Sequence, residues 1–267
     1  MTVNEFYKRL HLWIGYAVFK DPLPTALTTT KTQTQLLPLR MDNLTLHEDP
    51  ISGNCYKIVL TASLLGLPLS RRAYSIAKGE TRTPDFLRNI SVAGQIPVLQ
   101  VGANTFIPES NAACFFLADT NHDHNQYHSN GSSSSSASTP TSLIPTDRLH
   151  RAEMLRWMFF EQNQHETSIA VLRYWLKIIG FENLSEERRA QIATKRRQGE
   201  NALDVIEARL KESSSGFLVE CGMTLADVCL YAYTHVAHEA GFEMGKWPGI
   251  GEWCRRIERV EGFVRWD

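Results

Sequence analysis

Three small polar residues, Ser52, Gly53 and Asn54, stand directly before an apolar run at residues 55–65. The run is predicted to be a helix, because Gly66 follows it as a typical C-terminal stop. The start of a helix offers unpaired N–H groups and a partial positive charge, which together can hold an anion. The Ser52 hydroxyl can therefore act either as an ordinary helix cap or as a hydrogen-bond donor to a bound anion.

A second pair with such chemistry is Glu109 and Ser110, at the start of a predicted helix over residues 109–119. An acidic residue is favoured in a first helical turn, so an ordinary helix start would explain the pair. The alternative is a binding site, in which the Ser110 N–H and hydroxyl hold a carboxylate at the helix N-terminus.

The elements that would position these residues alternate between strand and helix. Alternating apolar residues indicate strands, and capping residues before an apolar run indicate helices. The predicted order is β-α-β-α-β-β-α, over residues 43–48, 55–65, 69–76, 84–88, 97–101, 105–107 and 109–119. The first strand–helix–strand crossover predicts a parallel strand pair, and the hairpin adds an antiparallel pair.

The last part of the chain is predicted to be helical throughout. The expected helices cover residues 148–179, 185–212, 224–240 and a final segment that begins at Pro248. Thr224 and Asp227 have the spacing of a capping box, which assigns Asp227 a structural role. The predicted fold class is therefore an α/β domain followed by an all-α domain.

Two segments differ from these blocks. Residues 1–40 are predicted to be a weakly ordered extension, with a mitochondrial presequence or a signal peptide as alternatives. Residues 121–146 include a Ser-rich stretch without apolar anchors, which is typical of a flexible linker. This linker separates a domain at residues 41–120 from a domain at residues 147–267.

Composition limits the class of protein further. Among the 267 residues, 28 Lys and Arg oppose 29 Asp and Glu, so a nucleic-acid or membrane partner is not expected. No apolar run reaches the length of a membrane span. The five cysteines lack the spacing of a disulfide framework, which favours a reducing compartment and a cytoplasmic location. No metal site is predicted, because ordering a flexible linker to bind a metal is costly for its three histidines, His122, His124 and His128.

Residues 52–57 (SGNCYK) resemble the active-site opening of a serine-type glutathione S-transferase. Three further segments follow in the order of that family's N-terminal domain: 83–86 (TPDF), 94–99 (GQIPVL) and 108–112 (PESNA). The second block resembles the family's helical domain at residues 156–162 (RWMFFEQ) and 224–227 (TLAD). The resemblance implies a thioredoxin-like domain followed by a helical bundle, and glutathione as co-substrate or cofactor.

The resemblance also implies roles for individual residues. Ser52 would donate a hydrogen bond to the glutathione sulfur and so favour the thiolate, the nucleophilic form. Cys55 is a rival for this role, although its apolar neighbours suggest a buried thiol. The implied glutathione-binding residues are Gly53, Asn54, Gln95, Ile96, Pro97, Glu109 and Ser110. In the family the bond before this proline is cis, whereas on the residues alone Pro97 could simply begin a strand.

The function implied is attack of the glutathione thiolate on an apolar electrophile, which gives a conjugate. His165, Glu166 and Arg173 are expected to face the pocket for this second substrate. The same thiolate could instead isomerise a conjugated double bond and leave unchanged, in a specialised biosynthetic pathway. A third possibility is a non-catalytic regulatory or scaffold protein with the same fold. A homodimer is expected by the same resemblance.

Overall fold

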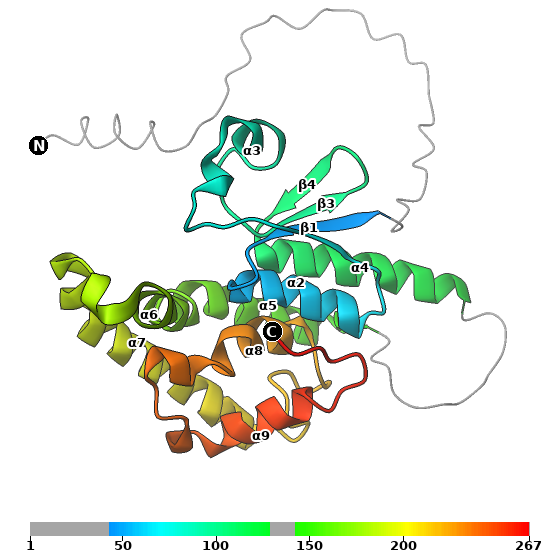
Figure 1. Ribbon diagram of the computed structural model, residues 1–267. Helices are drawn as coiled ribbons and strands as arrows, with labels where there is room; N and C mark the ends of the chain where they lie inside the picture. The colour runs from blue at the N-terminus through cyan, green and yellow to red at the C-terminus, as the bar shows by residue number, and fades with distance from the viewer. Residues whose placement is uncertain (1–42, 129–141, 267) are drawn as a thin grey trace, which may run out of the picture. The chain divides into compact units, whose positions relative to one another are not determined.

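The computed structural model describes residues 43–128 and 142–266 of the chain. The predicted N-terminal extension, residues 1–40, lies outside the described residues, as does the Ser-rich centre of the predicted linker. Within residues 43–266 the described elements belong to one compact unit. They comprise a small sheet with its helices, followed by a helical block (Figure 1).

The first part of the described chain is a four-stranded sheet with the order β2-β1-β3-β4. Its strands are β1 (Leu44–Glu48), β2 (Ser70–Ala73), β3 (Val98–Val101) and β4 (Thr105–Pro108). β1 and β2 are parallel, as the crossover through helix α2 (Gly53–Leu64) predicts. β3 pairs antiparallel with both β1 and β4. The predicted strand order along the chain and the predicted pairing are confirmed.

Helices cover both faces of this sheet. α2 and α4 (Ser110–His128) lie on the face toward the helical block, and α3 (Pro84–Asn89) lies on the other face (Figure 1). α3 begins where its sequence predicts, because the Thr83 side chain accepts a hydrogen bond from the Phe86 N–H and Pro84 occupies the first turn. α2 and α4, whose starts carry the candidate site, therefore lie between the sheet and the helical block.

The helical block is centred on α8 (Leu225–Thr234), whose ten residues are all buried. α8 packs against both α2 and α5 (Arg148–Phe160), so it joins the sheet domain to the helical block. Short turns of helix and two longer helices complete the block: η2 (Glu161–His165), α6 (Ile169–Arg173), η3 (Tyr174–Gly180), η4 (Phe181–Asn183), α7 (Glu186–Glu212), η5 (Ala237–Ala240), η6 (Met244–Lys246) and α9 (Pro248–Ile257). The predicted fold class, α/β followed by all-α, is confirmed.

The predicted continuous helix over residues 148–179 is wrong in one respect, because two π-helical stretches, η2 and η3, interrupt it. The hydroxyl groups of two residues that follow η2 form hydrogen bonds with its backbone carbonyl groups. The Thr167 hydroxyl donates to the Asn163 carbonyl, and the Ser168 hydroxyl donates to the carbonyls of Gln164 and His165. Such local bonds from Ser and Thr draw carbonyls away from the regular ladder and bend helices.

The predicted linker is shorter than residues 121–146. α4 continues to His128, and Leu143 and Ile144 are buried in the core. The Leu225 N–H, at the start of α8, donates to the Leu143 carbonyl over 2.9 Å. Two apolar residues at the end of this polar segment are enough to anchor it in the core. The buried N–H group at the start of α8 needs a hydrogen-bond partner, and the anchored segment supplies it.

Asp227 holds the start of α8 together, and its removal should destabilise the fold. Its carboxylate accepts from the backbone N–H groups of Thr224 and Leu218 and from the Trp253 indole, over 2.8, 3.0 and 2.9 Å. Asp227→Ala removes a cap and leaves buried donors unpaired, so the free energy of unfolding should fall by about 2–4 kcal/mol in urea denaturation.

The matched control is Asp147→Ala, which removes the cap of α5 at a position where the Asp side chain is 58% exposed. Water can satisfy the freed N–H groups there, so the expected loss is only about 1 kcal/mol. Equal losses in the two variants would contradict the role of Asp227 as the centre of a buried network.

Candidate active site

Two adjoining cavities lie where the sheet domain meets η2 and α6. The first has a volume of about 580 Å³ and the second about 540 Å³, within the range of small-molecule sites. They adjoin, because they share six lining residues: Asn54, Ile76, Gln95, Ile96, Gln162 and Glu166. Side chains from both halves of the described chain therefore meet at one site.

The first cavity contains the polar residues that the sequence singled out at the start of α4. Glu109 and Ser110 both line it, together with Pro97. Glu109 has a φ of 68°, a left-handed conformation that costs a non-glycine residue about 1–3 kcal/mol and is concentrated at functional sites. The peptide bond between Ile96 and Pro97 is cis, as predicted. Gln95 and Ile96 line both cavities, so this turn borders the whole site.

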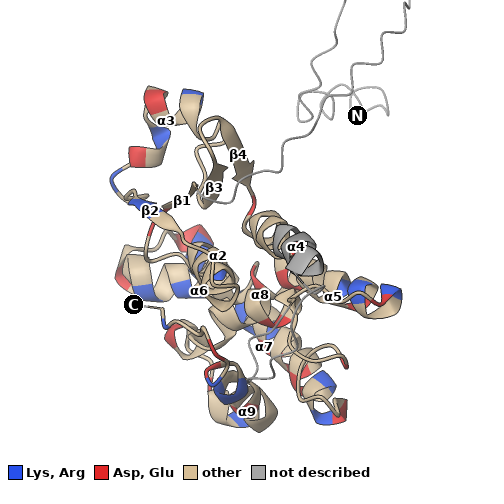
Figure 2. Cartoon of the chain, turned by 90° about the vertical axis from the view of Figure 1, so that its right-hand side faces the viewer, with Lys and Arg blue, Asp and Glu red and all other residues tan. Residues whose placement is uncertain are grey.

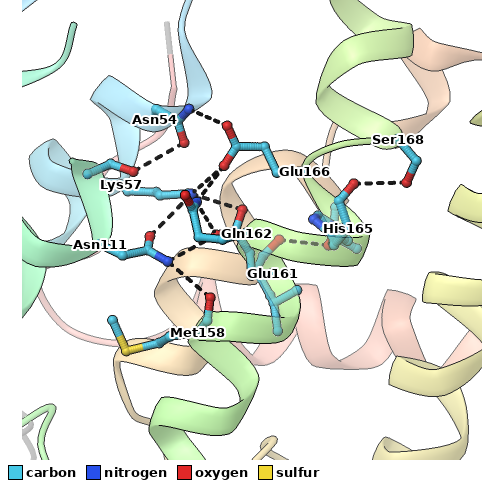
Figure 3. Close-up of polar contacts among 12 residues, drawn as sticks. Asn54, Lys57, Asn111, Met158, Glu161, Gln162, His165, Glu166 and Ser168 are labelled. Carbon is cyan, nitrogen blue, oxygen red and sulfur yellow. Dashed lines mark hydrogen bonds and ion pairs between the residues drawn. The ribbon is translucent and has the colours of Figure 1, made fainter. Parts of the chain in front are cut away.

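A buried ion pair lies behind the residues that line the site. The side chains of Lys57, on α2, and Glu161, on η2, are both fully buried, and Lys57 Nζ lies 2.9 Å from Glu161 Oε1. Lys57 Nζ also donates to Asn111 Oδ1 at 3.3 Å and to Glu166 Oε2 at 3.4 Å (Figure 3). Burial acts to lower the pKa of Lys57, but Glu161 and Glu166 outweigh it and raise that pKa above its ordinary value. Lys57 is therefore a fixed cation beneath the cavities.

Glu166 and Asn54 connect this ion pair to the cavities. Glu166 Oε1 accepts from Asn54 Nδ2 and Glu166 Oε2 accepts from Gln162 Nε2, both over 2.6 Å. The Asn54 amide oxygen in turn accepts from the Ser110 hydroxyl over 3.3 Å. The Asn54 side chain, which the sequence predicted as a glutathione donor, is thus engaged in holding the start of α4 against η2 (Figure 3).

Ser52 lines the second cavity and is half-buried. Among the described residues, its side chain makes no capping hydrogen bond to α2, so the predicted alternative of an ordinary cap is wrong. Cys55, the predicted rival, is 1% exposed, and burial raises the pKa of its thiol to about 12, although a hydrogen bond with Ser52 acts against the rise. Cys55 is therefore a neutral, buried thiol rather than a reactive one.

Gly53 has a different place from the one expected for a ligand-binding residue. It is buried and borders neither cavity as the described residues define them. A Cβ atom at this position would lie 2.6 Å from Tyr233 Cε1, closer than a side-chain contact allows. Glycine is needed here because an aromatic ring from α8 packs directly on the first turn of α2.

Of the three residues expected around the second substrate, two line the second cavity and one lies in the core. Glu166 and Arg173 line the second cavity. The Arg173 guanidinium is engaged, since its Nε lies 2.7 Å from Glu239 Oε2 and its Nη1 donates to the Ile51 carbonyl over 3.0 Å. His165 is placed otherwise. Its ring is fully buried with Nε2 2.9 Å from Thr234 Oγ1, and burial lowers its pKa to about 3.

Helix spacing explains the position of His165. Glu161 and His165 are four residues apart, so one face of the helix carries both into the core, whereas Glu166, the next residue, lines the cavity. His165 therefore faces α8 and packs as a neutral core histidine, so its predicted place in the pocket is corrected.

Sequence analysis missed three residues of this site: Lys57, Glu161 and Tyr233. Lys57 left a signal, because it is a cation inside an apolar run and such a residue needs a buried partner. Glu161 follows Phe159 and Phe160 in the same way. Tyr233 left none, since an aromatic residue in the apolar helix α8 is indistinguishable from core.

Other classes of site find little support in the described part of the chain. No group of three or more His, Cys, Asp or Glu side chains in residues 43–128 and 142–266 could hold a metal ion. The side chains of His122, His124 and His128 lie outside what the structure describes. No described helix is long and apolar enough to cross a membrane. Basic and acidic residues are mixed along the helices (Figure 2).

Comparison with known proteins agrees with this arrangement. Residues 162–261 match the family model described as the C-terminal domain of glutathione S-transferase. A curated relative, the glutathione S-transferase-like protein LUC7 of Fusarium sp, is 25% identical over 215 residues, which are 79% of this chain and 86% of the relative.

Solved structures extend the similarity over most of the chain. The crystal structure of a glutathione S-transferase from Pseudomonas fluorescens Pf-5 is 38% identical, with a TM-score of 0.70, and the match covers 84% of this chain and 98% of that one. Ure2p in complex with glutathione is 18% identical with a TM-score of 0.69, over 83% of this chain and 96% of that one, and shows the fold alone. The identity to the bacterial enzyme extends over nearly all of its length, and the chain belongs to the glutathione S-transferase family.

Proposed function

We propose that this protein binds glutathione and ionises its thiol beside Ser52, for attack on an apolar electrophile. The observation that carries the proposal is that the two cavities adjoin and share part of their lining. One end holds Glu109 and Ser110 at a helix start, the other holds Ser52 among apolar side chains, and the turn at Ile96 borders both. A ligand with a charged end and a reactive end suits such a space.

The first cavity fits the peptide end of glutathione. The N-terminus of α4 offers the Ser110 N–H to the γ-glutamyl carboxylate, and the Ser110 hydroxyl would exchange its bond to Asn54 for one to the same carboxylate. Glu109 offers an acceptor to the ammonium group. Ile96, directly before the cis peptide bond, can pair through its backbone with the cysteinyl residue as an added strand would. The strained Glu109 backbone supports a binding role, since strain of this kind is concentrated at ligand sites.

Ser52 then has the role of hydrogen-bond donor to the sulfur. A free thiol has a pKa of about 8.5 and is mostly protonated at neutral pH. A hydroxyl that donates to the thiolate favours the charged form and lowers this pKa, and the released proton passes to solvent. The Ser52 hydroxyl is free of a capping bond within the described residues, and the neighbouring Cys55 is held neutral by burial.

The second cavity suits an apolar partner for this thiolate. Its walls include Ile51, Ile76, Ala170, Val171 and Trp175, while the Arg173 guanidinium is occupied by Glu239. An apolar molecule would displace water from these walls, and its burial would place it beside Ser52. Conjugation is the simplest outcome, and isomerisation of a conjugated double bond would use the same thiolate.

Ser52→Ala should raise the thiol pKa of bound glutathione by about 1–2 pH units and lower kcat/KM by about 10- to 100-fold, because a hydrogen bond to a charged group is lost. The pKa is measured from thiolate absorbance during a pH titration. Product mass spectrometry on the wild type should find a glutathione adduct; an isomerised substrate without an adduct would instead favour the isomerase.

The control is Ser185→Ala, the same change at a helix start where the serine does cap, accepting from the Arg188 N–H. It should reduce stability and leave the thiol pKa at its wild-type value. An unchanged thiol pKa in Ser52→Ala would remove Ser52 from the mechanism.

Ser110→Ala should weaken glutathione binding by about 3- to 10-fold, since one hydrogen bond to the carboxylate is lost, with a smaller effect on the thiol pKa. Calorimetric titration with glutathione measures this Kd. Glu109→Gln, which keeps the side-chain shape and removes its charge, should also raise the Kd. If neither variant altered the Kd, the first cavity would not be the site of the γ-glutamyl group.

A homodimer is also part of the proposal. Leu149 and Phe159, at the two ends of α5, are 80% and 71% exposed, and large apolar side chains so exposed are typical of interaction surfaces. Light scattering at micromolar concentration should give twice the 30.3 kDa mass of the chain. Phe159→Glu should shift the mass toward the monomer, whereas Phe181→Glu, at the 49% exposed Phe181 on η4, should not. A monomeric wild type would refute this part.

A further inference from the structure

The turn that leads from β1 to Ser52, residues 49–52, is tied to the helical block. The Ile51 carbonyl accepts a hydrogen bond from Arg173 Nη1, on α6, over 3.0 Å. Within the turn, the Ser52 N–H donates to the Asp49 carbonyl over 2.9 Å. Ile51, Ser52 and Arg173 all line the second cavity, so this turn forms part of its wall.

Another part of that wall comes from the segment that follows β2. Ile76, three residues after the last residue of β2, lines both cavities. Ile51 and Ile76 are each 40% exposed. A side chain that lines a cavity and is also open to solvent lies at the opening of that cavity. Ile51 and Ile76 therefore belong to the rim of the second cavity.

One carboxylate joins these two parts of the rim. Asp49 Oδ1 accepts from the Ile51 N–H over 3.3 Å, and Asp49 Oδ2 accepts from the Ile76 N–H over 2.9 Å. The first bond is local and is typical of an aspartate in a turn. The second joins positions that are 27 residues apart, and the turn by itself does not need it. Asp49 thus holds two separate segments together at the opening of the cavity.

The contact requires a carboxylate at this position. Asp49 is 6% exposed, so little water reaches the two N–H groups that it accepts from. Its neighbour Glu48 is engaged elsewhere, since both of its oxygens accept from Arg71, over 2.6 and 3.1 Å. An amide of the same shape would keep one acceptor oxygen and present an NH₂ group, which only donates, to the other N–H. Asp49→Asn should therefore release one of the two segments.

We propose that Asp49 is a positioning residue of the second cavity: its carboxylate holds Ile51 and Ile76 in place before a second substrate arrives. The inference rests on the proposed function, because it takes the second cavity as the place of an apolar substrate. A rim that is already ordered does not have to be ordered on binding, whereas each side chain that must be immobilised lowers the affinity. An apolar group in this cavity should therefore bind less tightly once Asp49 is replaced.

The experiment compares glutathione with S-hexylglutathione in calorimetric titrations of the full-length protein. Both ligands have the same peptide part for the first cavity, and only the second ligand has an alkyl chain for the second cavity. The ratio of the two Kd values therefore reports on the second cavity. In the wild type the hexyl chain should strengthen binding, because it is removed from water. Asp49→Asn should reduce this gain by about 2- to 10-fold, with a smaller change in the Kd of glutathione itself.

The matched control is Asp85→Asn, the same change on α3, where the exposed Asp85 accepts from Asn89 Nδ2 over 2.7 Å. This variant should leave the ratio of the Kd values as in the wild type. An aspartate that only stabilised the fold would behave differently from a positioning residue: Asp49→Asn would lower the melting temperature and leave the ratio unchanged. That result would overturn the inference.

The outcomes also distinguish this inference from the proposed function. If glutathione does not bind, or if the hexyl chain brings no gain in the wild type, the proposed function is contradicted and the inference falls with it. If the gain is present and is equal in the wild type and in Asp49→Asn, the role of Asp49 alone is overturned.

Hydrogen exchange in the wild type tests the same contact without a variant, and so it applies even if Asp49→Asn fails to fold. The N–H groups of Ile51 and Ile76 should exchange slowly although both side chains are open to solvent, because each N–H is bonded to a buried carboxylate. Rapid exchange at either N–H would show that Asp49 does not hold that segment, and the inference would be wrong.

Discussion

The buried ammonium of Lys57 is the constraint on which the geometry of the site depends. A cation withdrawn from water is unfavourable by several kcal/mol unless it is paired and its protons are used. Here the partners come from separate elements: Glu161 from η2, Asn111 from α4 and Glu166 from beyond η2. Because Lys57 itself is on α2, satisfying one charge fixes the helix start of α2 against the helical block. The site depends on the fixed geometry of this ion pair and its partners rather than on their contribution to the free energy of folding.

The cavities are lined by the outer members of the same network. Glu166 accepts hydrogen bonds from both Lys57 and Asn54, and Asn54 accepts one from Ser110 at the start of α4. The two helix starts that face the ligand space are therefore held by one set of hydrogen bonds (Figure 3). The Asn54 amide is held on both sides, by Glu166 and by Ser110, so it serves position, and the backbone N–H groups nearby are left for a ligand.

Sequence patterns predicted the parts of this protein that depend on local signals. The crossover of β1, α2 and β2, the capping box of Asp227 and the turn at Pro97 are each encoded within a few consecutive residues. The buried network was not predictable in this way, because Lys57 and Glu161 are separated by 104 positions. The place of His165 was mispredicted because adjacent helical residues face different ways: Glu166 lines the cavity, whereas His165 lies in the core with Glu161.

The motif at the start of α2 also illustrates why a recognised pattern does not by itself assign roles. In sequence, Gly53 looks like a residue for a turn or for close approach of a ligand, whereas here it admits the ring of Tyr233. Tyr233 lies 180 positions further on, in a helix of the other domain, and lines the second cavity together with Ser52. A side chain larger than glycine at 53 would require a smaller residue at 233, so the serine site and the helical domain constrain each other. The space beside Ser52 is consequently a property of the joined domains, and the SGNCYK segment contributes one half of it.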